Sequence, residues 1–452
     1  MTGLGPVTHD FLAFVSRSHG WPGQAHGCLA RFLSPDRNIP LYKLRGIDST
    51  QIPAFGDVTG PEEINAVRQY HSVFHSILKL VPWDEFDRAI ERHDAKDRAR
   101  DFTHRSHLVA MLYAQFAGAV SLREIEAGLS SHANRLYHVH ATPAKRATLA
   151  EANSNRPAGI FSDLLAVMIQ QSHRKLRQSM DGVTYLIDST GLALNALSSR
   201  WAQFSAKVCG AKLHVVYDPD ADCPLYFGFT PARINDITAA REMPIEAGAT
   251  YVFDLGYYDY AWWAKLDAAS CRLVTRLKSY TPLRVIETLP LPAGTDNILS
   301  DQIGFLPARQ AKSRKNPMSD AVREIKVKID TGKILRVLTN DLDAPADEIA
   351  ALYKRRWAIE LFFRWIKQTL KVRHFYGRSE NAVRIQIAVA LIAFVLLRLA
   401  HLACHCAETM TRFSRLIRTA VFDRRPVERV GLKGMPQAGP VQNNTQGVLL
   451  WA

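Results

Sequence analysis

The chain has 452 residues, more than one hydrophobic core usually serves, so we expect two or three domains. A hydrophobic content of 47% with 22% charged residues excludes a largely disordered chain, and the net charge of +14 favours a polyanionic partner, nucleic acid before an anionic membrane. The six cysteines show neither CxxC pairs nor a His-spaced pattern, which argues against a disulfide framework or a zinc site and is typical of free thiols in a reducing cytosol.

Residues 1–60 carry no sustained hydrophobic period, and residues 1–20 lack the continuous apolar core of a signal peptide. We interpret them as a poorly ordered leader, or as the product of a start codon placed too far upstream. Residues 61–165 then show helical periodicity, with a capping box at Ser121 and Glu124. Short helices and several basic residues suit a DNA-binding module, and a plain helical bundle is equally consistent with the periodicity. The basic residues are Arg135, Lys145, Arg146 and Arg156.

From about residue 175 the pattern changes to short apolar strands interleaved with helices, which is typical of an α/β domain. Five strands are predicted, and the first and the fourth each end in an aspartate. Their ranges are Val183–Asp188, Lys212–Tyr217, Leu225–Phe229, Thr250–Asp254 and Arg272–Arg276. Helices are predicted before and after the fourth strand, at Ile234–Met243 and Asp259–Leu266.

Residues 279–341 predict a β-rich insertion, with strands at Leu283–Ile286, Glu324–Ile329 and Ile334–Leu338. A helical pattern returns after it, and residues 426–452 become rich in Gly, Pro, Asn and Gln, which predicts a flexible tail. The most apolar run, Ile385–Leu397, falls short of the roughly 20 residues that span a bilayer. We therefore expect a buried core helix and no membrane contact.

One carboxylate stands out in the segment that follows the insertion. Between Glu348 and Glu380 there are eight Lys or Arg residues and a single acid, Glu360, in what reads as one long helix. At about 100° per residue, Tyr353, Arg356, Glu360 and Lys367 fall on one stripe of that helix. An ordinary salt bridge between Glu360 and an arginine four residues away would explain the pattern. The other interpretation is a metal-binding carboxylate whose basic neighbours hold phosphates.

The spacing Tyr-x2-Arg-x3-Glu-x6-Lys resembles the signature of a group of DDE transposases from bacterial insertion sequences, insertion sequence family four. The resemblance continues through Phe375-Tyr-Gly-Arg-Ser-Glu-Asn-Ala-Val-Arg384 and covers most of residues 70 to 425. It implies a ribonuclease-H-like catalytic core at residues 175–278 and 342–425, interrupted by the β-rich insertion and preceded by a helical DNA-binding domain. Glu360 then stands where the family has its third catalytic acid.

Asp188 and Asp254 each end an apolar strand, where open α/β sheets carry functional residues. Taken singly, each is explained equally well by an Asx turn or the start of a loop. With Glu360 they supply three carboxylates at the family's metal-ligand positions, and such oxygen donors suit two Mg²⁺, or Mn²⁺, ions. Three other acids compete for these roles. Asp236 and Asp259 lie at helix starts and are predicted N-caps, and Asp218 begins a turn.

The resemblance implies that basic residues near the acids bind DNA. Arg276 and Lys278 resemble an Arg-x-Lys pair near the family's active site. Arg356 and Lys367 can reach phosphates in register with Glu360. Tyr353 can hydrogen-bond a phosphate, or it is simply a tyrosine on a helix surface.

The resemblance implies a cytoplasmic transposase that binds the terminal inverted repeats of an insertion sequence and cleaves DNA at the element ends. It then joins the freed 3′-hydroxyls to target DNA by metal-dependent phosphoryl transfer. Pairing of two ends implies a homodimer on DNA. The alternatives are a metal-dependent nuclease without strand transfer and a non-catalytic DNA-binding protein of the same fold, which would be expected to lack one of the three acids.

Overall fold

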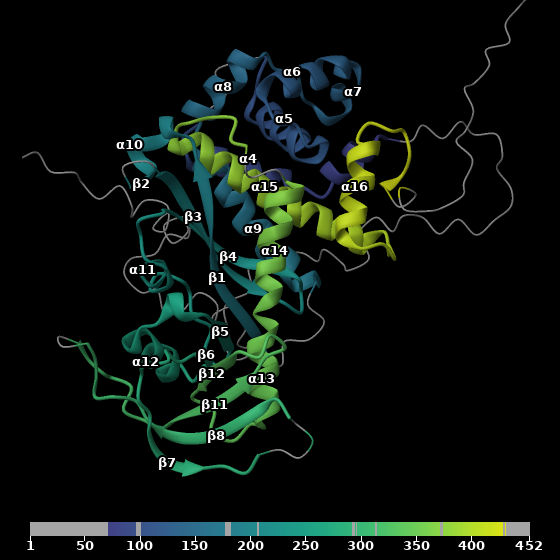
Figure 1. The fold of residues 1–452 in the computed structure, drawn as a ribbon. Helices are drawn as coiled ribbons and strands as arrows, with labels where there is room; N and C mark the ends of the chain where they lie inside the picture. Colours follow the sequence, from purple (N-terminus) through teal and green to yellow (C-terminus); the bar gives the residue numbers. More distant parts are fainter. Residues whose placement is uncertain are drawn as a thin grey trace, which may run out of the picture.

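The structure is a computed structural model, and it describes residues 71–95, 101–176, 182–205, 208–291, 294, 296–311, 314–370, 374–427 and 430. The predicted leader, the start of the helical region at Pro61 and most of the predicted tail lie outside these residues. Helices occupy one end of the molecule, at the top of Figure 1, and a single large sheet runs from them to the opposite end.

Seven α-helices and a 3₁₀ turn form the described part of the N-terminal region. They are α3 (Val73–Leu78), α4 (Trp83–Arg92), α5 (His104–Ala117), α6 (Leu122–Ser131), α7 (Ala133–Leu136), η2 (Tyr137–Val139), α8 (Arg146–Asn155) and α9 (Ala158–Leu176). Side chains cap two of these helix starts, and the capping box predicted at Ser121 and Glu124 is confirmed. Thr103 accepts a hydrogen bond from the backbone N–H of Ser106, and Ser121 accepts one from that of Glu124. Glu124 in turn accepts the backbone N–H of Val120 at 2.9 Å.

The five predicted strands are present as part of one sheet. They correspond to β1 (Thr184–Leu194), β3 (Val208–Asp218), β4 (Cys223–Pro231), β5 (Thr250–Phe253) and β6 (Arg272–Arg276). β1 pairs antiparallel with β3 and parallel with β5, and β5 pairs parallel with β6. Short elements η3 (Ala196–Ser198), α10 (Ser199–Ala202) and β2 (Gln203–Ser205) connect β1 to β3, and α11 (Asp236–Ala240), η4 (Leu255–Tyr257) and α12 (Tyr260–Ala268) flank β5.

The strands of the insertion extend this sheet instead of forming one of their own. β12 (Ile334–Thr339) pairs antiparallel with β6, and the order continues through β11 (Val322–Lys328) and β8 (Ile298–Phe305) to β7 (Arg284–Thr288). The short hairpin of β9 (Arg309–Ala311) and β10 (Arg314–Lys315) is a separate two-stranded sheet. The predictions for β7, β11 and β12 are confirmed, and β8 was not predicted.

The segment that reads as one long helix forms two, α13 (Ala346–Arg355) and α14 (Trp357–Thr369). The prediction of a continuous helix is therefore wrong. The break falls at Arg356, where the hydrogen bonds tighten to the i+3 pattern: Arg356 N–H donates to Tyr353 O, and Ile359 N–H donates to Arg356 O, both at 3.2 Å. No glycine or proline marks this turn, so the sequence pattern continues through it.

The two faces of the sheet carry different helices. Side chains of α13 and α14 pack in the larger core with Leu186 of β1, whereas α12 packs in a second core with Ile187. Because neighbouring residues of a strand point to opposite faces, these helices cover opposite faces of the sheet. Figure 1 shows α11 and α12 on one side and α13 and α14 on the other.

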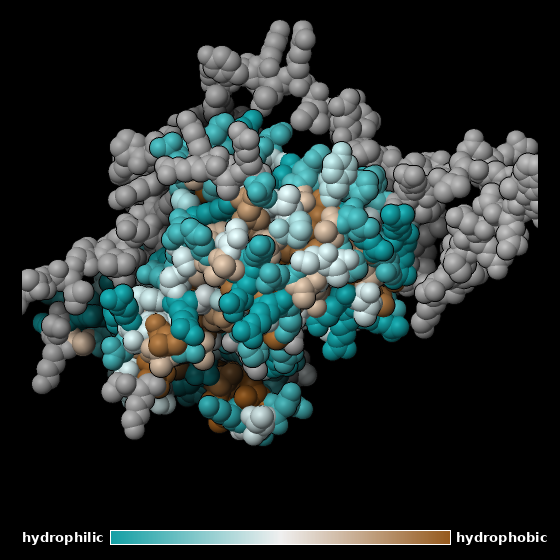
Figure 2. Space-filling view, turned by 90° about the horizontal axis from the view of Figure 1, so that it is seen from above, coloured by the Kyte–Doolittle hydropathy of each residue, from teal (hydrophilic) through white to brown (hydrophobic). Residues whose placement is uncertain are grey.

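The apolar run belongs to α15 (Glu380–Ala403), which is followed by α16 (Met410–Ala420). α15 has 24 residues, enough by length and composition to cross a membrane, so the expectation of a helix too short to do so is wrong. However, 78% of its most apolar 18-residue window is buried inside the protein, where it packs against α5, α8 and α9. Figure 2 looks onto the helical end, where hydrophilic side chains cover most of the surface and apolar ones form small separate patches.

Candidate active site

The register of β1 and β5 brings Asp188 and Asp254 to the same end of the sheet. The last residues in the parallel pairing are Ile187 and Phe253, so the two aspartates follow directly on neighbouring strands. Neighbouring strands lie about 4.8 Å apart. Asp188 does not end its strand as predicted, because pairing with β3 carries β1 on to Leu194. Asp254 does follow the end of β5, and its Oδ1 accepts the backbone N–H of Gly256 at 2.8 Å.

Glu360 reaches this end of the sheet from α14, which packs against β1. The side chain that joins it to Asp188 is Arg356, at the junction of α13 and α14. One guanidinium nitrogen of Arg356, Nη2, lies 2.5 Å from Oε1 of Glu360, and the other, Nη1, lies 3.3 Å from Oδ2 of Asp188. The salt bridge expected between Glu360 and a neighbouring arginine is thus present, and the same arginine also binds a carboxylate that is distant in sequence.

The surroundings of Asp188 shift the pKa of its carboxyl group. Burial raises its pKa to about 7. The backbone N–H of Ser189, at 2.7 Å, and the guanidinium of Arg356 act in the opposite direction, while the negative charges of Asp254 and Glu360 raise the pKa further. The three acids are therefore close enough to repel one another.

The basic and aromatic residues expected near the acids divide into two groups. Tyr353 is buried, its ring centroid lies 5.9 Å from Arg356, and the pKa of its hydroxyl is raised by burial and lowered by Arg356 and Arg276. Arg356 therefore contacts two of the acids, and Tyr353 lies beside Arg356, with Arg276 near enough to act on the Tyr353 hydroxyl. Lys278 lies over the ring of Tyr258 at 4.4 Å, and Lys367 is half-buried about two turns beyond Glu360.

The three competing acids have different roles. Asp259 caps α12 as predicted, by accepting the backbone N–H of Trp262, and Asp218 accepts the backbone N–H groups of the turn that it begins. Asp236 is not an N-cap: Asn235 precedes α11, and the Asp236 side chain accepts from Ser189 and Lys212 instead. Its role was missed, although the alternation of Lys212 and His214 on one face of a predicted strand pointed towards this position.

The three acids offer suitable donors for a divalent cation. All are carboxylates, and the pKa of Asp188 is raised first by burial and then by the negative charges of Asp254 and Glu360. In the geometry described, no group of three or more His, Cys, Asp or Glu side chains in the described ranges is gathered tightly enough to hold an ion. The guanidinium of Arg356 instead lies against two of the three acids.

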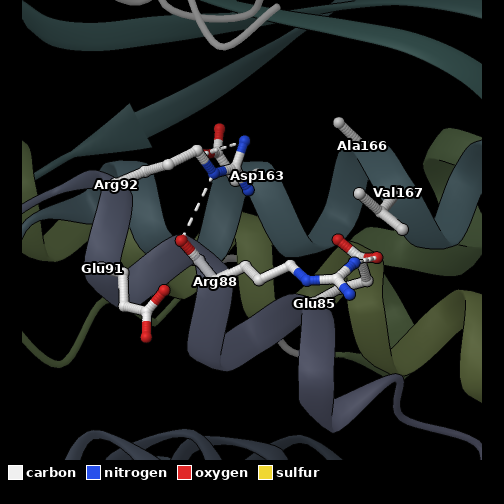
Figure 3. Close-up of a pocket in the computed structure, with 7 residues that line it drawn as sticks. All are labelled: Glu85, Arg88, Glu91, Arg92, Asp163, Ala166 and Val167. Atoms are coloured by element: carbon white, nitrogen blue, oxygen red, sulfur yellow. Dashed lines mark hydrogen bonds and ion pairs between the residues drawn. The ribbon is translucent and has the colours of Figure 1, made fainter.

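A surface hollow in the helical region lies apart from these acids. It is lined by residues of α4 and α9: Glu85, Arg88, Glu91, Arg92, Asp163, Ala166 and Val167. Figure 3 shows these side chains, of which Arg92 pairs with Asp163 at 3.1 Å and Arg88 with Glu85 at 2.5 Å. None of the sequence-predicted site residues lines it.

Comparison with known proteins identifies relatives over most of the chain. A family described as a transposase DDE domain matches residues 180–396, and a domain of unknown function, DUF4372, matches residues 69–140. Putative transposase y4zB of Sinorhizobium fredii is 39% identical over 64% of this chain and 80% of its own length. The probable transposase for insertion sequence element IS5377 of Geobacillus stearothermophilus is 29% identical over 73% of this chain and 85% of its own length.

Among solved structures, a piggyBac transposase synaptic complex with hairpin DNA aligns with 82% of this chain and 84% of its own, at a TM-score of 0.44 and 9% identity. That likeness is too weak to carry an argument. The sequence relatives are sufficient, because the chain covers four fifths of a transposase to which it is 39% identical over the aligned residues. The matched DDE domain includes Asp188, Asp254 and Glu360. The chain belongs to the DDE transposase family of bacterial insertion sequences.

Proposed function

We propose that this transposase binds the terminal inverted repeats of its insertion sequence, cleaves DNA at the element ends and joins the 3′-hydroxyl ends to target DNA. Asp188, Asp254 and Glu360 are the proposed catalytic residues. The observation that carries this assignment is the convergence of three acids from β1, β5 and α14 on one end of the sheet, with Arg356 touching two of them. A metal-dependent nuclease without strand transfer would need the same centre and is the second candidate.

The proposed core fold is ribonuclease-H-like. Its support is the element order: three antiparallel strands, β1, β3 and β4, are followed by a helix, the parallel strand β5, another helix and the parallel strand β6. The strands between β6 and α13 form the insertion in this scheme. They lengthen the sheet on the side of β6, away from β3 and β1.

The three carboxylates would hold two Mg²⁺ or Mn²⁺ ions. When bound, such ions activate a water or a 3′-hydroxyl and stabilise the leaving oxygen of an in-line phosphodiester displacement. The chain's own residues supply the rest. Arg356 keeps Asp188 and Glu360 together through one oxygen of each, which leaves the other oxygen of each carboxylate for a cation. The same group, with Arg276 and Tyr353, can then bind phosphates of the DNA strand.

Conservative replacement of the acids tests the assignment. Asp188→Asn, Asp254→Asn and Glu360→Gln should each reduce cleavage of end DNA in Mg²⁺ by at least about a thousandfold, because each removes a charged ligand from the reaction centre. Binding to end DNA, measured by gel shift, should stay near wild type, since these carboxylates repel phosphates.

Asp220→Asn is the matched control. Asp220 is an exposed acid that pairs with Arg355, and its replacement should leave cleavage unchanged. An Asp188→Asn protein that cleaves end DNA at the wild-type rate would contradict the assignment. A wild-type protein that hydrolyses end DNA but does not join the ends to target DNA would favour the nuclease.

A further inference from the structure

Asp236 is held by three side chains at the end of the sheet that carries the proposed catalytic acids. Its Oδ1 accepts hydrogen bonds from Oγ of Ser189 at 2.7 Å and from Nζ of Lys212 at 3.1 Å, and Nδ1 of His214 lies 3.7 Å from it. His214 lies opposite Ser189 in the pairing of β1 with β3. Asp236 therefore contacts β1 and β3 beside Asp188, just past the last paired residues of β1 and β5.

Ser189 links Asp236 to Asp188. Its hydroxyl donates to Asp236, and its backbone N–H donates to Oδ1 of Asp188 at 2.7 Å. The side chains of Asp188 and Ser189 leave opposite faces of β1, because they are neighbours on one strand. Asp236 thus supports the strand from the face opposite Glu360, and any shift of Ser189 moves the donor that orients the Asp188 carboxylate.

Asp236 also faces Asp254 across a glycine. A Cβ at Gly256 would lie 3.0 Å from Oδ1 of Asp254 and 3.3 Å from Oδ2 of Asp236. The two carboxylates therefore converge on backbone that leaves no room for a side chain. The oxygen of Asp236 that faces Asp254 is not the one that receives Ser189 and Lys212.

A second, independent observation is the hydroxyl of Tyr257. This residue is 1% exposed, and its hydroxyl lies beside that of Ser189 without completing a hydrogen bond of good geometry with any described residue. Burial is the largest cause that raises the pKa of this hydroxyl, and the charges of Asp188, Asp236 and Asp254 raise it further. A buried hydroxyl without a partner is costly unless something polar accepts from it or donates to it.

We propose that Asp236 and Tyr257 are positioning residues of the reaction centre, which orient Asp188 and Asp254 from the face of the sheet opposite Glu360 and so raise their affinity for a divalent cation. This inference rests on the proposed function, since it concerns the same acids. Mg²⁺ and Mn²⁺ keep several water molecules when they bind to proteins. The hydroxyl of Tyr257 and Oδ2 of Asp236, the oxygen that does not bind Ser189 and Lys212, suit hydrogen bonds to such waters. Partners of this kind commonly change metal affinity by about 10–100-fold.

The test measures Mn²⁺ binding to the full chain without DNA, from the free Mn²⁺ signal in electron paramagnetic resonance. Asp236→Asn should raise the Mn²⁺ concentration for half-saturation by about 10–100-fold. Tyr257→Phe should raise it by a smaller factor, because only one hydrogen bond is lost. Ser189→Ala should behave like Asp236→Asn and Ser189→Thr should restore binding, since threonine keeps the hydroxyl. Asp220→Asn, at an exposed site, should bind as wild type.

Melting temperatures in EDTA, measured on the same preparations, separate positioning from a purely structural role. Asp236→Asn with a lower melting temperature but wild-type Mn²⁺ affinity would overturn the inference. Normal binding by Asp236→Asn beside loss of binding by Asp188→Asn would overturn only the role of Asp236. An Asp188→Asn protein that binds Mn²⁺ normally would overturn the proposed centre itself, and this inference with it.

Discussion

Asp188 is the residue on which the local structure and the proposed chemistry make opposite demands. It lies within β1, where a hydrophobic side chain would suit the buried strand, yet a carboxylate is placed there beside two other acids. The backbone N–H of Ser189 and the guanidinium of Arg356 compensate only in part, so the pKa stays near 7. Strain of this kind is common where a protein holds charges for catalysis instead of stability.

This raised pKa predicts how stability depends on pH. Between pH 3.8, the ordinary pKa of an aspartate, and about pH 7, the folded protein binds more protons at Asp188 than the unfolded chain does. The free energy of unfolding therefore falls as pH rises through this window, and the penalty is complete above pH 7. In EDTA, Asp188→Asn should melt higher than wild type at pH 8, by at least about 2 °C. The difference should shrink towards pH 5.

Calorimetry of both proteins at several pH values between 5 and 8 measures this difference. Asp220→Asn serves as the reference for a change of one exposed carboxylate. A difference between wild type and Asp188→Asn that is constant across the range would show that the Asp188 carboxyl is not held in its neutral form.

At the scale of elements, the alternation of apolar residues predicted the strands that bear Asp188 and Asp254, because these strands are buried and end in turn residues. β8 escaped prediction for a physical reason. Its centre contains Ser300, Asp301 and Gln302, and Asp301 is buried only because Arg323 of β11 pairs with it at 2.6 Å. The partnership of Asp236 with Ser189 and Lys212 depends on strand pairing in the same way. Contacts between segments distant in sequence leave no local pattern.

The break between α13 and α14 matters for function because it places Arg356 at a turn. The predicted stripe on one helix put Tyr353 and Glu360 on a common face, whereas the structure brings them together from two helices with Arg356 between them. The salt bridge and the phosphate-binding interpretation are therefore compatible. Arg356 can neutralise the acids in the free protein and bind DNA in the complex.

We predict that Arg356→Ala and Lys367→Ala reduce cleavage of paired end DNA by about 10-fold or more, because each removes a cationic side chain of a type that binds phosphates. Mn²⁺ binding should persist in both variants. Arg355→Ala is the control, since Arg355 adjoins Arg356 in sequence but pairs with Asp220, away from the acids. If Arg356→Ala has a lower melting temperature but unchanged cleavage per folded molecule, Arg356 only stabilises the fold through its salt bridges.

At the scale of the whole molecule, the helical N-terminal region and the C-terminal helices share one core. α15 packs against α5, α8 and α9, and Asn381 at its start donates to the backbone oxygens of Asn153 and Arg156. A fragment limited to the N-terminal helices would lose these partners and expose the apolar surface that α15 covers. End recognition by this region therefore has to be tested in the full chain.

Within that region, Lys145 and Arg146 at the start of α8 are exposed, whereas Arg156 is committed to the backbone oxygens of Phe102 and Thr103. If the region contacts end DNA, Lys145→Glu and Arg146→Glu should each weaken binding and lower the slope of log affinity against log salt by about 1. Arg88→Glu is the matched control.

Arg88 is also exposed and positively charged, but it lies in the hollow of Figure 3 among the acids of α4, where phosphates would be repelled. The three variants change the net charge equally. Equal losses in all three would indicate only the effect of overall charge. Unchanged binding in Lys145→Glu and Arg146→Glu would remove this part of α8 from the interface and favour the basic hairpin of β9 and β10, where Arg309, Arg314 and Lys315 are grouped.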